Sequence, residues 1–240
     1  MKNDNQQFWE EFSAEYEKSV GETGDVHHEF VINPVVFALL GDLKGKTVLD
    51  AGCGNGYLSR KMAKAAKKVV GIDFTKTFIQ TAKERSNGYD NLTFLQGNLE
   101  KMPFSDREFD SILCNMVLIN VENLDTVVGE LSRALKTDGR LVVSITHPCF
   151  ENLPFTYSLK DEKGKTTARV VTRYFTTGLT INTEDKNQFH YHYTLSDYFN
   201  AFSEHGLCLE KTVEPDGCEV AKDRQPDITP TFLILRLKKN

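Results

Sequence analysis

The sequence lacks the features that mark membrane and secreted proteins. No apolar run approaches the roughly 20 residues that a helix needs to span a bilayer. The first residues, MKNDNQQFWEEF, are polar and acidic, unlike a secretory signal peptide. The five cysteines are odd in number and include no C-x-x-C pair, which favours reduced thiols over disulfides or a metal site. We therefore expect a cytoplasmic protein without a membrane partner.

Positive charge is also in deficit. Lys and Arg total 29 against 34 Asp and Glu, a formal net charge of −5, which disfavours a nucleic-acid backbone as the main partner. The lysines between residues 61 and 68 form a local basic patch, and their spacing fits the solvated face of a helix better than an RNA contact. No internal repeat or low-complexity tract divides the 240 residues, which are enough for one α/β domain.

What the sequence does contain is a glycine-rich turn in the segment TVLDAGCGNG, residues 47–56. Its first three residues favour a β-strand, Asp50 ends that strand, and alternate glycines follow. Residues 58–67 then show a helical pattern with one apolar face. A strand, a glycine turn and a helix begin a nucleotide-binding α/β unit, in which backbone N–H groups can approach a ligand closely.

The spacing of the glycines indicates the ligand. A dinucleotide site has the pattern G-x-G-x-x-G, whereas this chain has D-x-G-x-G-x-G with Asp50 at the strand end. A carboxylate there would repel a pyrophosphate but can accept hydrogen bonds from an ammonium group. The segment resembles motif I of the class I S-adenosylmethionine-dependent methyltransferases, whose loop lies against the amino-acid part of that cofactor. Any tight strand-to-helix turn can carry such glycines, so the later motifs decide.

Three later segments follow in the order of that family. Residues 68–72 predict a second strand that ends at Asp73, where a carboxylate can hold a ribose diol. Thr75 is an expected helix N-cap. Residues 92–96 predict a third strand, and the following GNLEKMPF resembles the family's G-D-A-E-x-L-P-F. Asn98 stands where the family usually has Asp, and its amide oxygen can accept the same hydrogen bond from adenine.

The resemblance extends over residues 45–147. Residues 109–115 match the family's fourth strand, and residues 131–141 match a helix-turn-strand segment in which Gly139 is expected to close the turn. The implied cofactor is S-adenosylmethionine, with S-adenosylhomocysteine as product. The resemblance implies cofactor contacts at Tyr16, Asp50, Gly52, Cys53, Gly54, Asp73, Phe74, Asn98, Leu99 and Asn115.

Residues 1–44 predict a helical cover over this core. Phe8, Trp9, Phe12 and Tyr16 form an aromatic stripe at helical spacing, which is typical of a helix packed on a core. In related methyltransferases a tyrosine in such a helix often closes over the cofactor, so Tyr16 is a candidate lid residue. A flexible turn with two histidines is expected next, before a helix that starts at Asn33 and Pro34.

The candidate catalytic and substrate-binding residues come from a turn, a strand end and an insertion. His28 in that turn is one candidate. His147 ends the fifth predicted strand, at the edge where open α/β sheets bind ligands, and is the candidate general base. Residues 148–193 predict a β insertion cap of two or three strands, with pieces at 168–175 and 178–181. Tyr174, His190 and Tyr191 are its candidate substrate contacts; no carboxylate or cysteine pattern completes a metal site.

Residues 194–202 predict a capped helix, and 207–213 and 231–237 predict two strands, the last of them antiparallel. The expected architecture is one doubly wound, Rossmann-like domain. It has a seven-stranded mixed sheet with an antiparallel last strand, an N-terminal helical cover (1–44), a cofactor-binding core (45–147), the insertion cap (148–193) and a C-terminal helix and strand pair (194–240).

The expected function is methyl transfer from S-adenosylmethionine to a small-molecule acceptor. Methylation of RNA or protein is the first alternative, and the acidic chain and the enclosing cap count against it. Two further alternatives are a binder of the adenosyl cofactor without catalysis and an NAD oxidoreductase. The D-x-G-x-G-x-G spacing speaks against NAD. The sequence leaves the acceptor and the oligomeric state open.

Overall fold

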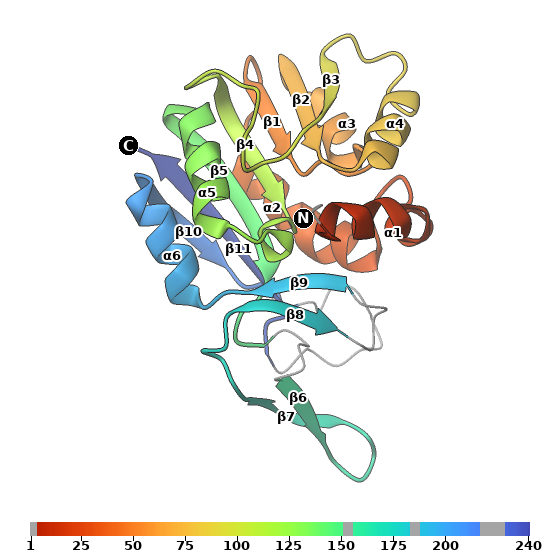
Figure 1. Ribbon diagram of the computed structural model, residues 1–240, viewed down its shortest axis with the longest axis vertical. Coiled ribbons are helices and arrows are strands. Elements are labelled where there is room, and N and C mark those ends of the chain that lie inside the picture. Colours follow the sequence, from red (N-terminus) through yellow and green to blue (C-terminus); the bar gives the residue numbers. More distant parts are fainter. Residues whose placement is uncertain (1–3, 151–155, 183–187, 217–228) are drawn as a thin grey trace.

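The computed structural model describes residues 4–150, 156–182, 188–216 and 229–240. A seven-stranded sheet with the order β10-β11-β5-β4-β1-β2-β3 forms its centre (Figure 1). The strands from β3 to β5 pair in parallel, and β11 lies antiparallel between β5 and β10. This confirms the predicted seven-stranded mixed sheet. Its strands are β1 (Thr47–Ala51), β2 (Lys68–Asp73), β3 (Leu92–Gln96), β4 (Phe109–Asn115), β5 (Leu135–Thr146), β10 (Leu207–Val213) and β11 (Phe232–Lys239).

Helices cover both faces of the sheet because alternate residues of the buried strands point in opposite directions. Leu49 and Val70 pack on the face covered by α5 (Leu124–Ala134) and α6 (Leu195–Glu204). Their neighbours Val48 and Val69 pack on the other face, with α2, α3 and α4. These helices span Asn33–Leu40, Tyr57–Ala63 and Lys76–Glu84. The result is a three-layer arrangement with an apolar cluster on each side of the sheet.

The N-terminal cover consists of α1 (Asp4–Val20), the π-helix η1 (His28–Ile32) and α2. The structure corrects the expectation of a flexible turn at the two histidines. His27 already has helical dihedrals, and η1 runs directly into α2. Pro34 therefore lies inside a longer helical segment. The wider π turn before it gives the proline ring room that a regular α-turn would deny.

The insertion forms two separate hairpins. β6 (Thr156–Lys160) pairs with β7 (Thr166–Val171), and β8 (Gly178–Asn182) pairs with β9 (Gln188–His192). The β8–β9 hairpin lies next to the body of the domain, where β9 contacts the short 3-10 helix η2 (Leu118–Asn120), while β6–β7 projects away from it (Figure 1). Strand β6 was not expected from the sequence. Its side chains are largely exposed, so it lacks the alternating apolar pattern that predicts a half-buried strand.

Two local expectations have different outcomes. Thr194 caps α6 in a reciprocal capping box with Asp197, as the sequence predicts. In the turn before the long part of β5, however, the left-handed residue is Asp138, with φ +60°. Gly139 is needed there for a different reason: a Cβ on it would lie 2.6 Å from the carbonyl oxygen of Lys136. Among the helices described, none has the length and apolarity to cross a membrane.

Candidate cofactor site

A cavity of about 830 Å³, open to solvent, lies at the carboxyl ends of the parallel strands. Each of its main walls follows one strand: Gly52 and Gly54 after β1, Asp73 and Phe74 after β2, Asn98 and Leu99 after β3, and Asn115 at the end of β4. Residues from four separate segments thus line one cavity. All seven of them are among the cofactor contacts that the resemblance implies.

The glycine loop is held by hydrogen bonds from its backbone N–H groups to strand β2. Gly52 and Cys53 donate backbone hydrogen bonds to the carbonyl of Ile72, and Gly54 donates one to the carboxylate of Asp73. These N–H groups are therefore already paired within the protein. Gly52 and Gly54 have φ values of +74° and +51°, a region that side chains rarely adopt. A Cβ on Gly52 would also lie 2.3 Å from a methyl of Val117. Glycine is required here by backbone shape and by close packing.

Asp73 is one of the acidic residues that line the cavity. It is buried, and its two oxygens accept hydrogen bonds from the backbone N–H groups of Gly54 and Thr75, both at 2.9 Å. Burial raises the pKa of Asp73, and these two bonds oppose that shift because they stabilise the charged form. The carboxylate is thus fixed in direction and lines the cavity.

Asp50 and Cys53 lie behind the glycine loop, outside the cavity lining. The Ser59 hydroxyl donates a 2.5 Å hydrogen bond to Asp50, which is 2% exposed. Burial raises the pKa of Asp50 to about 7; the Ser59 bond opposes this, and the nearby charge of Asp73 adds to it. Burial also raises the pKa of the Cys53 thiol well above its ordinary value. Both residues support the loop from beneath.

Helix α1 supplies the opposite wall. Tyr16 lines the cavity, where the sequence predicted a lid, and so do Asn5 and Trp9, which sequence reasoning missed as site residues. The rings of Trp9 and Tyr16 lie 6.3 and 5.6 Å from that of Phe78, which also lines the cavity. Burial raises the pKa of Tyr16 far above its usual value. The i, i+4, i+11 spacing of residues 5, 9 and 16, which places them on one face of a helix, was the available signal for this wall.

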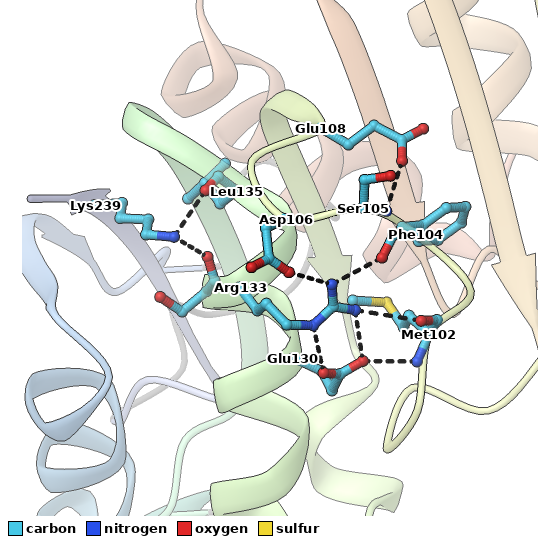
Figure 2. Close-up of polar contacts among 10 residues, drawn as sticks. Met102, Phe104, Ser105, Asp106, Glu108, Glu130, Arg133, Leu135 and Lys239 are labelled. Atoms are coloured by element: carbon cyan, nitrogen blue, oxygen red, sulfur yellow. Dashed lines mark hydrogen bonds and ion pairs between the residues drawn. The ribbon is translucent and has the colours of Figure 1, made fainter.

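A second set of contacts holds the loop after β3 in place. Figure 2 shows the Arg133 guanidinium at the end of α5 donating to the carbonyls of Met102 and Phe104 and to the carboxylates of Asp106 and Glu130. Glu130 in turn accepts a hydrogen bond from the backbone N–H of Met102. These bonds raise the pKa of Arg133 further above its already high value. The segment that follows Asn98 and Leu99 is therefore fastened to α5.

The candidate substrate residues are not part of the cavity lining. The two ring nitrogens of buried His147 contact protein groups: Nε2 lies 2.8 Å from a Glu214 oxygen, and Nδ1 accepts a bond from the N–H of Cys149. His28 is buried with its Nδ1 3.0 Å from an Asp25 oxygen. The structure thus does not bring these two histidines to the cavity.

The insertion residues have structural partners as well. The Tyr174 hydroxyl accepts a hydrogen bond from the N–H of Leu195, at the start of α6. His190 pairs with Thr180 across the β8–β9 hairpin, and Tyr191 of the same hairpin is 7% exposed. Among the described residues, no group of three or more His, Cys, Asp or Glu is arranged to hold a metal ion.

Comparison with known proteins identifies the family. Residues 42–195 match the family model described as a methyltransferase domain. The chain belongs to this methyltransferase family. The resemblance to the class I S-adenosylmethionine-dependent methyltransferases is thereby confirmed, and S-adenosylmethionine is the cofactor of that class.

The individual relatives match only part of this methyltransferase. The demethylmenaquinone methyltransferase of Tropheryma whipplei is 38% identical over 111 residues, which cover 46% of each chain. The 2-phytyl-1,4-naphtoquinone methyltransferase of Thermosynechococcus vestitus is 33% identical over 109 residues, 44% of this chain and 48% of its own. The chain therefore matches these curated relatives over about half of their length.

Solved structures show the same fold over most of the chain. An S-adenosylmethionine-dependent methyltransferase from Mesorhizobium loti superposes with a TM-score of 0.77 at 23% identity, covering 91% of this chain and all of the other. The [4+2]-cyclase SpnF also superposes, with a TM-score of 0.68 at 14% identity over 98% of this chain and 94% of its own. The fold alone therefore does not determine the reaction.

The site's residues fit S-adenosylmethionine. The cofactor carries positive charge on its sulfonium and ammonium groups. Among the described residues, the charged ones that line the cavity are acidic: Asp73, Glu100 and Glu122. Asp73 is already aimed by two backbone donors and can accept from a ribose diol. A Cβ on Gly54 would meet only open space, so the cavity remains wide beside the glycine loop.

Proposed function

We propose that this methyltransferase transfers the methyl group of S-adenosylmethionine to a small-molecule acceptor. The observation that carries the proposal is the convergence of Gly52, Asp73, Asn98 and Asn115, from the ends of four parallel strands, on one cavity closed by α1. The relatives that share the core are named as methyltransferases of quinones, which are small molecules. A cavity walled by strand ends on one side and by α1 on the other favours such an acceptor over RNA or a folded protein.

Each predicted cofactor contact has a proposed task in this reaction. Asp73 holds the ribose hydroxyls, Asn98 and Leu99 contact the adenine, and Gly52, Gly54 and Asn115 border the amino-acid part. Phe74 and Tyr16 enclose the cofactor and exclude water, and Asp50 and Cys53 support the loop from behind. When bound, the cofactor supplies an electrophilic methyl group on a sulfonium. The protein's contribution is alignment, which can account for about 7–11 kcal/mol of a barrier.

The lining favours an uncharged or cationic acceptor. Its described residues include aromatic rings at Trp9, Phe74 and Phe78 and no Lys, Arg or His. An acceptor with a phosphate or carboxylate beside the reacting atom would meet only acidic or neutral groups. A flat, apolar ring with a hydroxyl or amine nucleophile fits the lining better.

A general base is needed only where the acceptor must lose a proton. His147 remains our candidate for that role, with His28, Tyr174, His190 and Tyr191 as candidate acceptor contacts. For His147 to act, its Nε2 must exchange the Glu214 carboxylate for the acceptor, directly or through a water. The His147→Ala variant is therefore expected to keep cofactor affinity and to lose turnover only with acceptors that carry a weakly acidic proton.

Calorimetric titration with S-adenosylmethionine, S-adenosylhomocysteine and NAD tests the cofactor directly. Binding of both adenosyl ligands without NAD supports the proposal. Transfer of a labelled methyl group to a panel of quinols, phenols and amines then tests the reaction. Failure of both adenosyl ligands to bind would overturn the proposal, and binding without any methyl transfer would favour a non-catalytic binder or another reaction on this fold.

A further inference from the structure

Helix α1 carries two parallel stripes with different partners. Asn5, Trp9 and Tyr16 face the cavity, whereas Glu10 and Glu17, seven residues apart, face helix α4 and the glycine loop. Seven residues span about 10 Å along a helix. Glu10 meets the start of α4 and Glu17 meets its end, so the two helices lie side by side in the same direction.

Glu10 takes over the capping of α4. Thr75 occupies the N-cap position, but its side chain makes no capping hydrogen bond. Instead the Glu10 carboxylate accepts from the backbone N–H groups of Lys76 and Thr77, at 2.5 and 3.2 Å, and from the Thr77 hydroxyl at 2.9 Å. A carboxylate at a helix N-terminus also interacts favourably with the helix dipole. One end of α1 is thus attached to the helix that follows the Asp73 strand.

Glu17 connects α1 to the glycine loop. One of its oxygens accepts a 2.9 Å hydrogen bond from the side-chain amide of Asn55, and the other forms an ion pair with Arg85. Asn55 is buried in the glycine loop, and its amide also donates to the carbonyl of Gly21, just beyond α1. Its side-chain oxygen accepts from the N–H of Tyr57 at the start of α3. Asn55 therefore links α1 to the turn that borders the cavity.

On the basis of the function proposed above, we propose that Glu17 is a positioning residue for cofactor binding. It acts through Asn55, so that the docked position of α1 and the shape of the glycine loop stabilise each other. Any ligand that prefers the ordered loop then favours docking of α1, and docked α1 raises the affinity for that ligand by the same factor. Glu17 itself is outside the cavity lining, so its proposed effect on the ligand is indirect.

The only tryptophan of the chain provides the readout. Trp9 lies on α1 and lines the cavity, so its fluorescence reports on S-adenosylhomocysteine binding without turnover. We expect Glu17→Ala to raise the Kd for S-adenosylhomocysteine about 10-fold, within the usual range of coupling between sites. Glu17→Gln keeps an acceptor for Asn55 and is expected to restore most of the affinity. Arg85→Met removes only the ion pair and is expected to have a smaller effect than Glu17→Ala.

Glu11→Ala is the matched control because Glu11 is on the same helix, is exposed, and accepts a hydrogen bond from Gln7 within α1. It is expected to bind like the wild type. Hydrogen exchange gives an independent measure: ligand should slow exchange in residues 9–20 of the wild type, and Glu17→Ala should lose that protection while β1 and β2 keep theirs.

Two results would overturn the proposal. One is a wild-type Kd in folded Glu17→Ala; the other is an equal loss of affinity in Glu17→Gln and Glu17→Ala, which would exclude a role through the Asn55 bond. If Glu17→Ala does not fold, Glu17→Gln and Arg85→Met still discriminate, because both remove the ion pair and keep the acceptor for Asn55: a loss of about 10-fold in each would assign the effect to the ion pair and overturn the proposal, whereas small losses support it. Absence of ligand binding by the wild type would instead overturn the proposed function.

Discussion

Four predicted site residues at strand ends line the cavity, whereas the predicted site residues of the insertion do not. Gly52, Asp73, Asn98 and Asn115 follow four parallel strands and meet in one cavity. Tyr174 comes from the insertion and binds the start of α6 instead. In a parallel sheet, all carboxyl ends lie at one edge, so chain position brings a strand-end residue to that edge. The side chain can still turn away from the cavity, as His147 after β5 does toward Glu214. The destination of an insertion residue depends on packing that no local pattern encodes.

The largest expected effect comes from Asp73. Asp73→Ala removes the acceptor for the proposed ribose contact and leaves the N–H groups of Gly54 and Thr75 without their partner. Each hydrogen bond to a charged group contributes about 1.5–3 kcal/mol, so the Kd for S-adenosylhomocysteine should rise about 100-fold in calorimetry. Tyr174→Phe, in the insertion, is the control from the other region and should leave this Kd unchanged. Equal losses in both variants would contradict the contrast between the regions.

Gly52→Ala should have the next largest effect. The new methyl would overlap Val117, and the φ of +74° adds a cost of about 1–2 kcal/mol for a residue with a side chain. We expect a Tm lower by about 5 °C in thermal unfolding, together with weaker ligand binding. Adding Val117→Ala should recover part of the loss. No recovery would mean that backbone strain alone, rather than the contact with Val117, explains the requirement for glycine.

Asp50 should make stability depend on pH. Its pKa in the folded state is about 7, above the ordinary value of 3.8, so the folded protein binds more protons than the unfolded chain between these values. The free energy of unfolding should therefore fall as pH rises through this window, and level off above it. Asp50→Asn does not titrate, so its Tm relative to the wild type should increase from about pH 5 to about pH 8. A constant Tm difference would contradict the raised pKa.

Tyr174→Phe should have the smallest effect. It removes the acceptor for the Leu195 N–H and should lower stability by about 1 kcal/mol without changing the Kd for S-adenosylhomocysteine. Tyr157→Phe, at an exposed position of β6, is the control and should change neither quantity. A loss of cofactor affinity in Tyr174→Phe would bring the insertion into the cofactor site and weaken the comparison.

The sequence was most informative where residue spacing follows backbone geometry. The glycine spacing and the acidic strand ends predicted the sheet and its order of motifs, and eight of the twenty residues that line the cavity were predicted as cofactor contacts. Asp50 in β1 and Cys53 in the glycine loop were placed next to the cavity, but their burial behind the loop depends on Ser59 and on packing from the other side. Asn5, Glu10 and Glu17 were missed as a group because their partners at residues 120, 76 and 55 are far along the chain.

The anchoring of α1 also has a consequence for folding. Asn5 donates to the carbonyl of Asn120, 115 residues later, and the partners of Glu10 and Glu17 belong to the glycine loop and to α4. Contacts between residues so far apart form slowly, since a long loop must close before they contribute. During synthesis α1 emerges before every one of these partners. Although it is made before its partners, α1 should thus reach its native place only after the first four parallel strands have formed, so the cavity closes late in folding.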